Sequence, residues 1–118
     1  MTTTAFLILS LLLIKHWYID FVDQTVSEIE QKGIYGSLEG FMHSVKQALG
    51  TALVLLCFAP SIIVVLGLAF LDLFLHYHVD WLKSNYGCQD MCDNRFWSHL
   101  GFDQLIHQIT YLVICLLL

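Results

Sequence analysis

Charged residues and basic stretches are scarce in this sequence, and there is a single proline. Only 13% of the 118 residues are charged while 58% are hydrophobic, and the mean hydropathy is +0.71. Soluble domains have about 25% charged and about 45–50% apolar residues, so the composition excludes an ordinary soluble globule. Five Lys and Arg residues stand against ten Asp and Glu residues, giving a net charge of −5. Without a basic stripe to neutralise a phosphate backbone, nucleic acid is excluded as an expected partner.

Long apolar segments fill almost the whole chain. A transmembrane helix needs about 20 mostly apolar residues, and the segments lack the alternation typical of membrane barrel strands. The first segment has no basic region before it and stays apolar beyond Lys15, so we expect a retained helix rather than a signal peptide. Pro60 stands where a third helix would begin. We therefore predict an all-α integral membrane bundle, one domain over residues 1–118, with four transmembrane helices at about 4–26, 37–58, 61–83 and 96–118.

Two polar connections, residues 27–36 and 84–95, should lie at the same end of this bundle, which we call the loop end. The Lys and Arg residues fall on or toward the loop end, so the positive-inside rule favours cytoplasmic loops with both termini outside. The same end also carries nearly every acid, which weakens that inference. Cys88 and Cys92 share the second connection, and their spacing leaves open an incidental pair, a disulfide or a metal clip.

An internal repeat relates the two predicted helical hairpins at an offset of 60 residues. The stretch from His16 to Phe21 matches the stretch from His76 to Trp81 in pattern and character. Further along, His43 aligns with Asp103, and Gln47 with His107. Both halves then have the same topology, with a pseudo-twofold axis along the membrane normal.

Ionisable residues gather in stripes on the predicted helices, close to the loop end. At about 100° per residue, His and Asp four positions apart share a face on three helices. Such residues inside a membrane usually face the interior of a bundle and mark a functional site. The second helix adds a further histidine. The stripes contain His16, Asp20 and Asp23; His43; Asp72, His76, Asp80 and Lys83; and His99, Asp103 and His107.

Neutral imidazole and carboxylate are ligands that suit zinc, manganese or iron. The predicted ligands could hold two ions, or one ion whose histidines are oriented by further carboxylates. The predicted metal ligands are His16, Asp20, His43, His76, Asp80, Asp103 and His107. We expect His78, which points off its stripe, and His99, near the interface, to be peripheral.

Four short motifs carry a resemblance to a known family. They are His16-x3-Asp20-Phe21-x2-Gln24, then His43, then His76-x3-Asp80-x2-Lys83, and Asp103-Gln104-x2-His107. In this the chain resembles an uncharacterised family of small polytopic membrane proteins from bacteria and their phages, a domain of unknown function. The resemblance implies a location in a bacterial inner membrane but no settled activity. A looser similarity links such proteins to membrane-bound metal-dependent hydrolases, and the order of the His and Asp residues is similar to that of helical phosphohydrolases.

Three functions remain open on these residues. The leading expectation is a metal-dependent hydrolase acting on a lipid or phosphate ester at the loop end, with Asp23 or Asp72 as general base. A carrier or sensor of metal ions or protons is the second, although helices 2 and 4 are apolar beyond Gln47 and beyond residues 110–111. The third is a small interaction protein whose polar cluster is structural. Whether the chain forms a homo-oligomer also stays open.

Overall fold

The computed structural model describes residues 2–59 and 61–118, so Pro60 lies outside the described residues. Every regular element in these ranges is helical, as predicted. The elements are α1 (Thr3–Trp17), the π-helix η1 (Tyr18–Asp23), α2 (Val26–Gln31), α3 (Leu38–Leu56), α4 (Ile62–Tyr86) and α5 (Asn94–Leu117).

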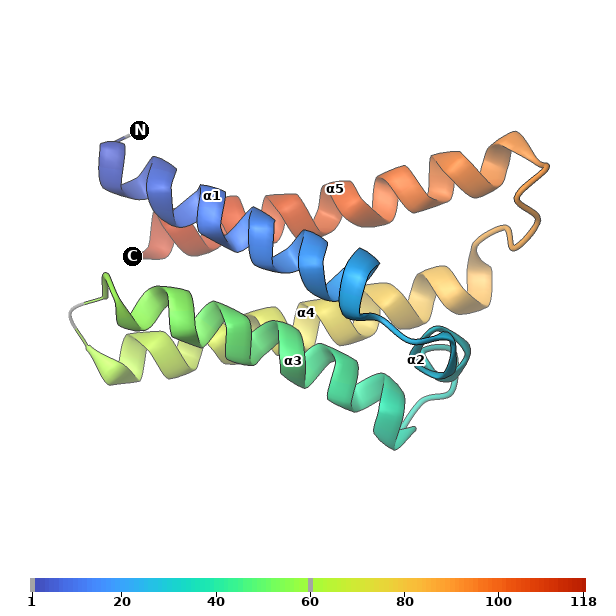
Figure 1. Ribbon diagram of the computed structural model, residues 1–118, viewed down its shortest axis with the longest axis horizontal. Helices are drawn as coiled ribbons and strands as arrows, with labels where there is room; N and C mark the ends of the chain where they lie inside the picture. Colours follow the sequence, from blue (N-terminus) through green and yellow to red (C-terminus); the bar gives the residue numbers. More distant parts are fainter. Residues whose placement is uncertain (1, 60) are drawn as a thin grey trace.

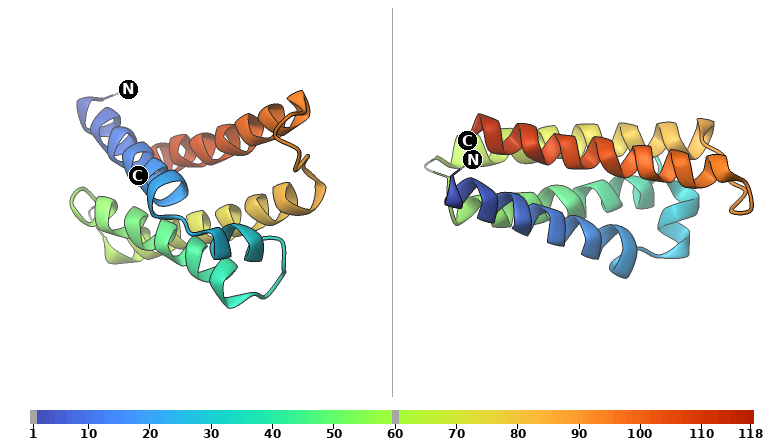
Figure 2. Two further views of the ribbon diagram at one scale, coloured as in Figure 1. Left: turned by 45° about the vertical axis from the view of Figure 1, so that its right-hand side comes forward. Right: turned by 90° about the horizontal axis from the view of Figure 1, so that it is seen from above.

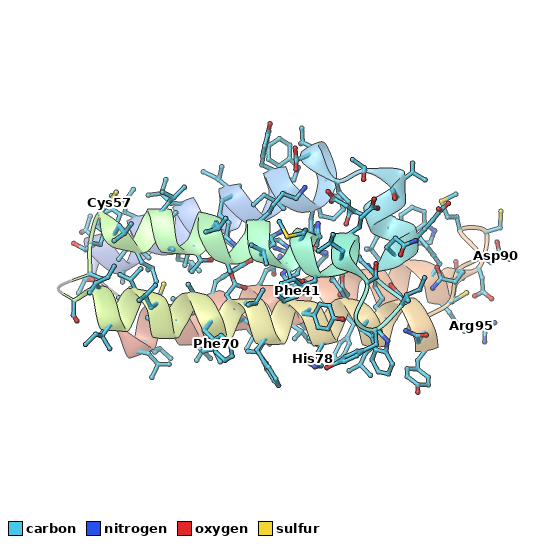
Figure 3. The ribbon with its side chains drawn as sticks, turned by 90° about the horizontal axis from the view of Figure 1, so that it is seen from below. Phe41, Cys57, Phe70, His78, Asp90 and Arg95 are labelled. Atoms are coloured by element: carbon cyan, nitrogen blue, oxygen red, sulfur yellow. The ribbon has the colours of Figure 1, made fainter. Side chains whose placement is uncertain are left out.

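The four long helices pack as an antiparallel bundle (Figure 1). Helix α3 contacts α4, α4 contacts α5, and α1 contacts both α3 and α5, so the two predicted hairpins close into a ring. Both termini lie at one end of the bundle, as two further views also show (Figure 2). Cys57 lies near this terminal end, whereas Asp90 and Arg95 lie at the loop end (Figure 3).

Three helical stretches, rather than the predicted four, are long and apolar enough to cross a membrane among the described residues. They are Thr3–Asp23, Ile62–Tyr86 and Asn94–Leu117. The 25 residues of α4 span about 37 Å against a hydrocarbon thickness of about 30 Å. The prediction of a fourth spanning helix is wrong because α3 carries too many polar side chains. Those side chains are Glu39, His43, Ser44, Lys46, Gln47 and Thr51.

The first helix also ends earlier than predicted, and it ends in a π-helix. The backbone leaves the helix at Gln24, and the side chain of Thr25 then caps α2 by accepting a hydrogen bond from the backbone N–H of Glu28. Part of the predicted polar connection is therefore the short helix α2. Because a π-helix has more residues per turn than an α-helix, residues late in η1 are turned away from the stripe that starts at His16.

The bundle has an inverted distribution of polarity. Among the described residues, thirteen polar or charged ones are buried against nine hydrophobic ones, while most large apolar side chains lie on the outside. A soluble protein would show the opposite arrangement, so the outer surface fits lipid. The apolar part of the interior is a layer toward the terminal end, formed by Ile8, Leu12, Leu55, Val65, Leu68, Tyr111 and Ile114.

Helix α2 lies at the loop end of the bundle, packed against α3 (Figure 1). It approaches α3 very closely at Gly40, where a Cβ atom would lie 2.9 Å from the carbonyl oxygen of Gln31. Glycine at this position therefore lets the two backbones meet. Lys32 is the residue directly after α2, and its side chain is buried.

Candidate metal centre

All seven predicted metal ligands gather inside the bundle, between the apolar layer and α2. Each of them is at most 5% exposed. They come from every long helix and from η1, so no single element makes the site. The seven are His16 of α1, Asp20 of η1, His43 of α3, His76 and Asp80 of α4, and Asp103 and His107 of α5.

Three pairs of His and Asp, each four residues apart, have the same geometry. Nε2 of the histidine lies 3.3 Å from a carboxylate oxygen in His16–Asp20, in His76–Asp80 and in Asp103–His107. In His76–Asp80 and Asp103–His107 both residues lie on one α-helix, and side chains four residues apart share a face of such a helix. In the first pair, the start of the π-helix still keeps Asp20 on the side of His16. Three helices therefore present one repeated unit to the interior.

Contacts between helices join these pairs into one cluster. Nε2 of His43 lies 2.9 Å from Oδ1 of Asp20, and Nε2 of His76 lies 3.4 Å from the same oxygen. Nε2 of His107 lies 3.2 Å from Oδ1 of Asp80. Three groups of three residues bring one ligand atom each within 4.8 Å of one another: His16, Asp20 and His76; His43, His76 and Asp80; Asp80, Asp103 and His107.

His76 lies at the centre of the cluster and is fully buried. Within the described part of the chain, neither of its ring nitrogens has a hydrogen-bond partner, and the same holds for Oδ1 of Asp103. Oδ2 of Asp80 has no hydrogen bond of good geometry but lies 3.0 Å from Nζ of Lys32. Buried polar atoms are normally satisfied, because leaving one unpaired costs about 1–3 kcal/mol. One ring nitrogen of His76, together with a neighbouring carboxylate oxygen, is therefore free to bind a cation.

The spacing of these atoms also fits a metal ion. Ligand atoms about 2.1 Å from a tetrahedral ion lie about 3.4 Å from one another. Nε2 of His76 lies 3.3 Å from Oδ2 of Asp80 and 3.4 Å from Oδ1 of Asp20, without the direction of a hydrogen bond. The residues present thus have both the donor types and the separations that a divalent transition metal takes.

The histidine rings themselves pack face to face and edge to face. The rings of His76 and His107 stack with centroids 4.0 Å apart, and His16 lies 5.0 Å from His107. His43 lies 5.3 Å from His76. Neutral imidazoles, the form that binds metals, can pack this closely without repelling one another.

Lys15 is a member of the polar interior that the sequence did not suggest. Its Nζ donates to Oδ2 of Asp72 at 3.1 Å, to Oε1 of Gln47 at 2.7 Å and to the Tyr111 hydroxyl at 3.1 Å. Its side chain crosses α3 at Gly50, where a Cβ atom would lie 3.0 Å from Cδ of Lys15. This network forms the floor of the cluster, next to the apolar layer.

Lys32 closes the cluster from the loop end and was also missed. Its Nζ lies 3.0 Å from Oδ2 of Asp80, and the residue is only 7% exposed. Burial lowers the pKa of Lys32, but the attraction of Asp80 and Asp20 outweighs burial and raises the pKa above its usual value. Lys32 lies beyond the periodic helices, so no spacing in the sequence could have pointed to it.

Glu28 of α2 links the cluster to the rim. Its Oε2 lies 3.1 Å from Nδ1 of His43, and its Oε1 accepts a hydrogen bond from Lys46 at 2.6 Å. Burial raises the pKa of Glu28, but the hydrogen bonds with Lys46 and His43 outweigh burial and lower it. A carboxylate that holds the far nitrogen of a histidine orients the ring toward a metal.

The two predicted general bases lie outside the three candidate metal groups. Asp72 is buried in the floor, where Lys15 and the hydroxyl of Thr51 donate to its Oδ2. The side chain of Asp23 is 41% exposed and pairs with Lys46 at 2.7 Å, because η1 turns it toward the rim. His78 binds the hydroxyl of Tyr35 and the carbonyl of Phe74 outside the cluster.

The fold and the site together define the class of protein. It is a helical bundle with an apolar outer surface, three helices long and apolar enough to cross a membrane among the described residues, and a buried cluster of His and Asp residues that could hold a metal ion. The chain matches the family described as "Protein of unknown function (DUF3307)" over residues 8–118, and it belongs to that family. All seven predicted ligands fall within the matched residues. No curated protein and no solved structure matches the chain.

Proposed function

We propose that this protein binds one or two divalent transition-metal ions within the membrane and uses them to hydrolyse a lipid or phosphate ester at the loop end. The observation that carries the proposal is His76, fully buried among carboxylates at metal-ligand spacing with both ring nitrogens unpaired among the described residues. Zinc, manganese and iron(II) all accept this donor set.

The two oxygens of Asp80 support a site for two ions. Oδ2 faces His43 and His76, at 3.6 and 3.3 Å from their Nε2 atoms. Oδ1 faces His107 at 3.2 Å, next to Asp103. A carboxylate that serves a different group through each oxygen can bridge two metals, an arrangement suited to displacement at phosphorus.

The reaction would add one water across the ester bond. A new bond forms between the water oxygen and phosphorus, the bond from phosphorus to the alcohol oxygen breaks, and a water proton goes to the leaving alcohol. Bound metal ions supply a lowered pKa for water and stabilise developing charge. Of the chain's own groups, Glu28 orients His43 and accepts a hydrogen bond from Lys46, so it joins Asp23 and Asp72 as a candidate for moving the proton.

The apolar layer argues against the carrier that the sequence left open. An ion pathway through the membrane needs polar lining on both sides of the cluster. Below the Lys15 network, the described interior is closed by side chains such as Leu12, Leu55 and Ile114, each fully buried. An ion in the cluster would therefore exchange with the solution at the loop end rather than pass through to the terminal end.

A structural role is a second candidate, and the two buried lysines favour it. Lys15 and Lys32 pair with Asp72 and Asp80, so part of the carboxylate charge is balanced without any metal. In that case the cluster would hold the bundle together as a hydrogen-bonded network, and the protein would act through its partners.

Metal analysis of the protein purified in detergent without chelators tests the proposal. We expect about one or two equivalents of a divalent transition metal, and hydrolysis of phosphatidic acid or a soluble phosphate ester that depends on it. Asp80→Asn should lose both. A folded wild type free of transition metal would leave the structural role as the better account. The proposed location is a bacterial inner membrane with cytoplasmic loops.

A further inference from the structure

A groove between α4 and α5 leads from the outer surface to the cluster. It has a volume of about 230 Å³, and its apolar lining includes Val79, Leu82, Phe102 and Ile106. Lys83, His99 and Asp103 also line it, the last of which is one of the candidate metal ligands. The groove thus offers apolar and polar side chains next to one another, with Val79 and Ile106 farthest along α4 and α5 from the loop end.

Two hydrogen-bond donors at the polar side are free to take an anion. An ammonium group has three donors, and the described residues engage only one from Lys83, which donates to Oδ2 of Asp103 at 3.2 Å. Nδ1 of His99 accepts a hydrogen bond from the backbone N–H of Cys88 at 2.8 Å. In the neutral ring the proton then lies on Nε2, which has no partner in the described chain and is available to donate.

We propose that this groove binds the phosphate monoester headgroup of an anionic lipid through Lys83 and His99, with the start of an acyl chain on Val79, Leu82, Phe102 and Ile106. The inference rests on the proposed function, because it names the substrate class for that site. An ion held by Asp80, Asp103 and His107 would neutralise Asp103 and leave the charge of Lys83 for the phosphate. A free phosphate ion would gain nothing from the apolar side, so the geometry favours the lipid.

A photoreactive phosphatidic acid in nanodiscs of phosphatidylcholine tests this binding without relying on activity. We expect saturable labelling of peptides from α4 and α5 around Val79 and Phe102. Lys83→Gln should reduce labelling roughly tenfold, as loss of a charge-assisted hydrogen bond implies, and His99→Gln several-fold. Lys83→Arg should restore most of it, which guards against a folding defect.

The chain offers a matched control in a second apolar groove between α3 and α4. That groove has a volume of about 550 Å³, and Phe41, Phe70 and His78 are among its lining residues (Figure 3). Phe70→Ala should leave the labelling unchanged. Equal labelling of the Lys83→Gln variant, labelling centred on Phe41 and Phe70, or displacement of the photoreactive lipid by inorganic phosphate as readily as by phosphatidic acid would each overturn the inference.

Metal content measured on the same samples separates the two proposals. Metal-loaded protein with no selective lipid labelling would overturn the lipid site and leave the metal site standing. Selective labelling of protein that holds no metal would support the lipid site while the hydrolase proposal fails.

Discussion

Nε2 of His107 lies 3.2 Å from Oδ1 of Asp80, a residue 27 positions earlier in the chain. Gln47 makes the equivalent contact in the first half, where its Nε2 lies 3.0 Å from Oδ1 of Asp20, again 27 positions earlier. These four residues match one another at the 60-residue offset of the internal repeat. The repeat therefore describes contacts as well as sequence. The two halves differ at this pair of positions, where the first half has the amide Gln47 and the second half has His107. The second half therefore holds the greater share of the predicted metal ligands.

Replacement of His76 should remove the bound metal. His76 belongs to two of the three candidate groups, so His76→Ala should lose at least one equivalent of metal per chain, measured by elemental analysis of the purified protein. Asp80→Ala should lose more, since its two oxygens face two groups. His78→Ala is the control, because His78 binds Tyr35 outside the cluster and should keep the wild-type content.

Removal of the metal should lower the thermal stability of the wild type. The free energy of metal binding contributes to the stability of the folded protein, and chelation removes this contribution. The buried carboxylates then also repel one another. We expect a lower melting temperature after chelation, and a far smaller change in His16→Ala, His43→Ala or Asp103→Ala. A chelator effect lost in His78→Ala but kept in His76→Ala would contradict the assigned ligands.

The buried pair of Lys15 and Asp72 should be costly to break from one side. Lys15→Met leaves the Asp72 carboxylate in the interior with Thr51 as its remaining donor, and this should cost about 3–5 kcal/mol of stability. The double variant Lys15→Met, Asp72→Leu should be less destabilised than the sum of the single variants. Unfolding of all four proteins in a graded detergent mixture gives the coupling energy, and simple additivity would show that the pair is not formed.

Lys32→Gln should strengthen metal binding, because the ammonium group competes for Oδ2 of Asp80.

The raised pKa of Lys32 also fixes the sign of a pH effect in the metal-free protein. The contribution of the pair is fully present below the unfolded pKa of about 10.4 and is lost as the pH rises through the higher folded value. Melting curves of wild type and Lys32→Gln should therefore differ at pH 8 and converge at strongly alkaline pH, whereas a constant difference would contradict the pairing.

Both termini should lie on the membrane side opposite the two connections. Accessibility labelling of Cys88, compared with a Thr2→Cys probe, measures this. Cys57, Cys92 and Cys115 should be replaced by serine in both proteins, and Cys88 as well in the Thr2→Cys protein, so that each has one reactive thiol. Labelling of both probes from the same side would contradict the topology, and the bundle would then have to cross the membrane differently.

Helical periodicity was enough to predict which side chains meet, because His16, His76 and Asp103 each share a face with a partner four residues away. It could not predict the two buried lysines. Lys15 lies about 100° from His16 around α1 and reaches the interior sideways across Gly50, and Lys32 follows a short helix with no apolar stripe of its own.

The two errors in the helices have physical causes of the same kind. Six polar side chains on α3, four of which are buried in the interior, lower its apolarity below that of a membrane span although it packs in the bundle like the others. The π-helix at Tyr18–Asp23 changes the phase along the first helix, and a fixed rotation of 100° per residue cannot follow such a change. Asp23 was placed on the stripe for this reason and lies at the rim.

The layer of Leu12, Leu55 and Ile114 beneath the polar interior separates the cluster from the terminal end of the bundle. An ion held above it would exchange with the solution at the loop end and would ignore concentrations on the far side of the bilayer. It would also cross only part of the electric field, so the membrane potential would alter its occupancy only weakly. The same barrier would let the protein keep a charged site deep in the membrane without dissipating a gradient.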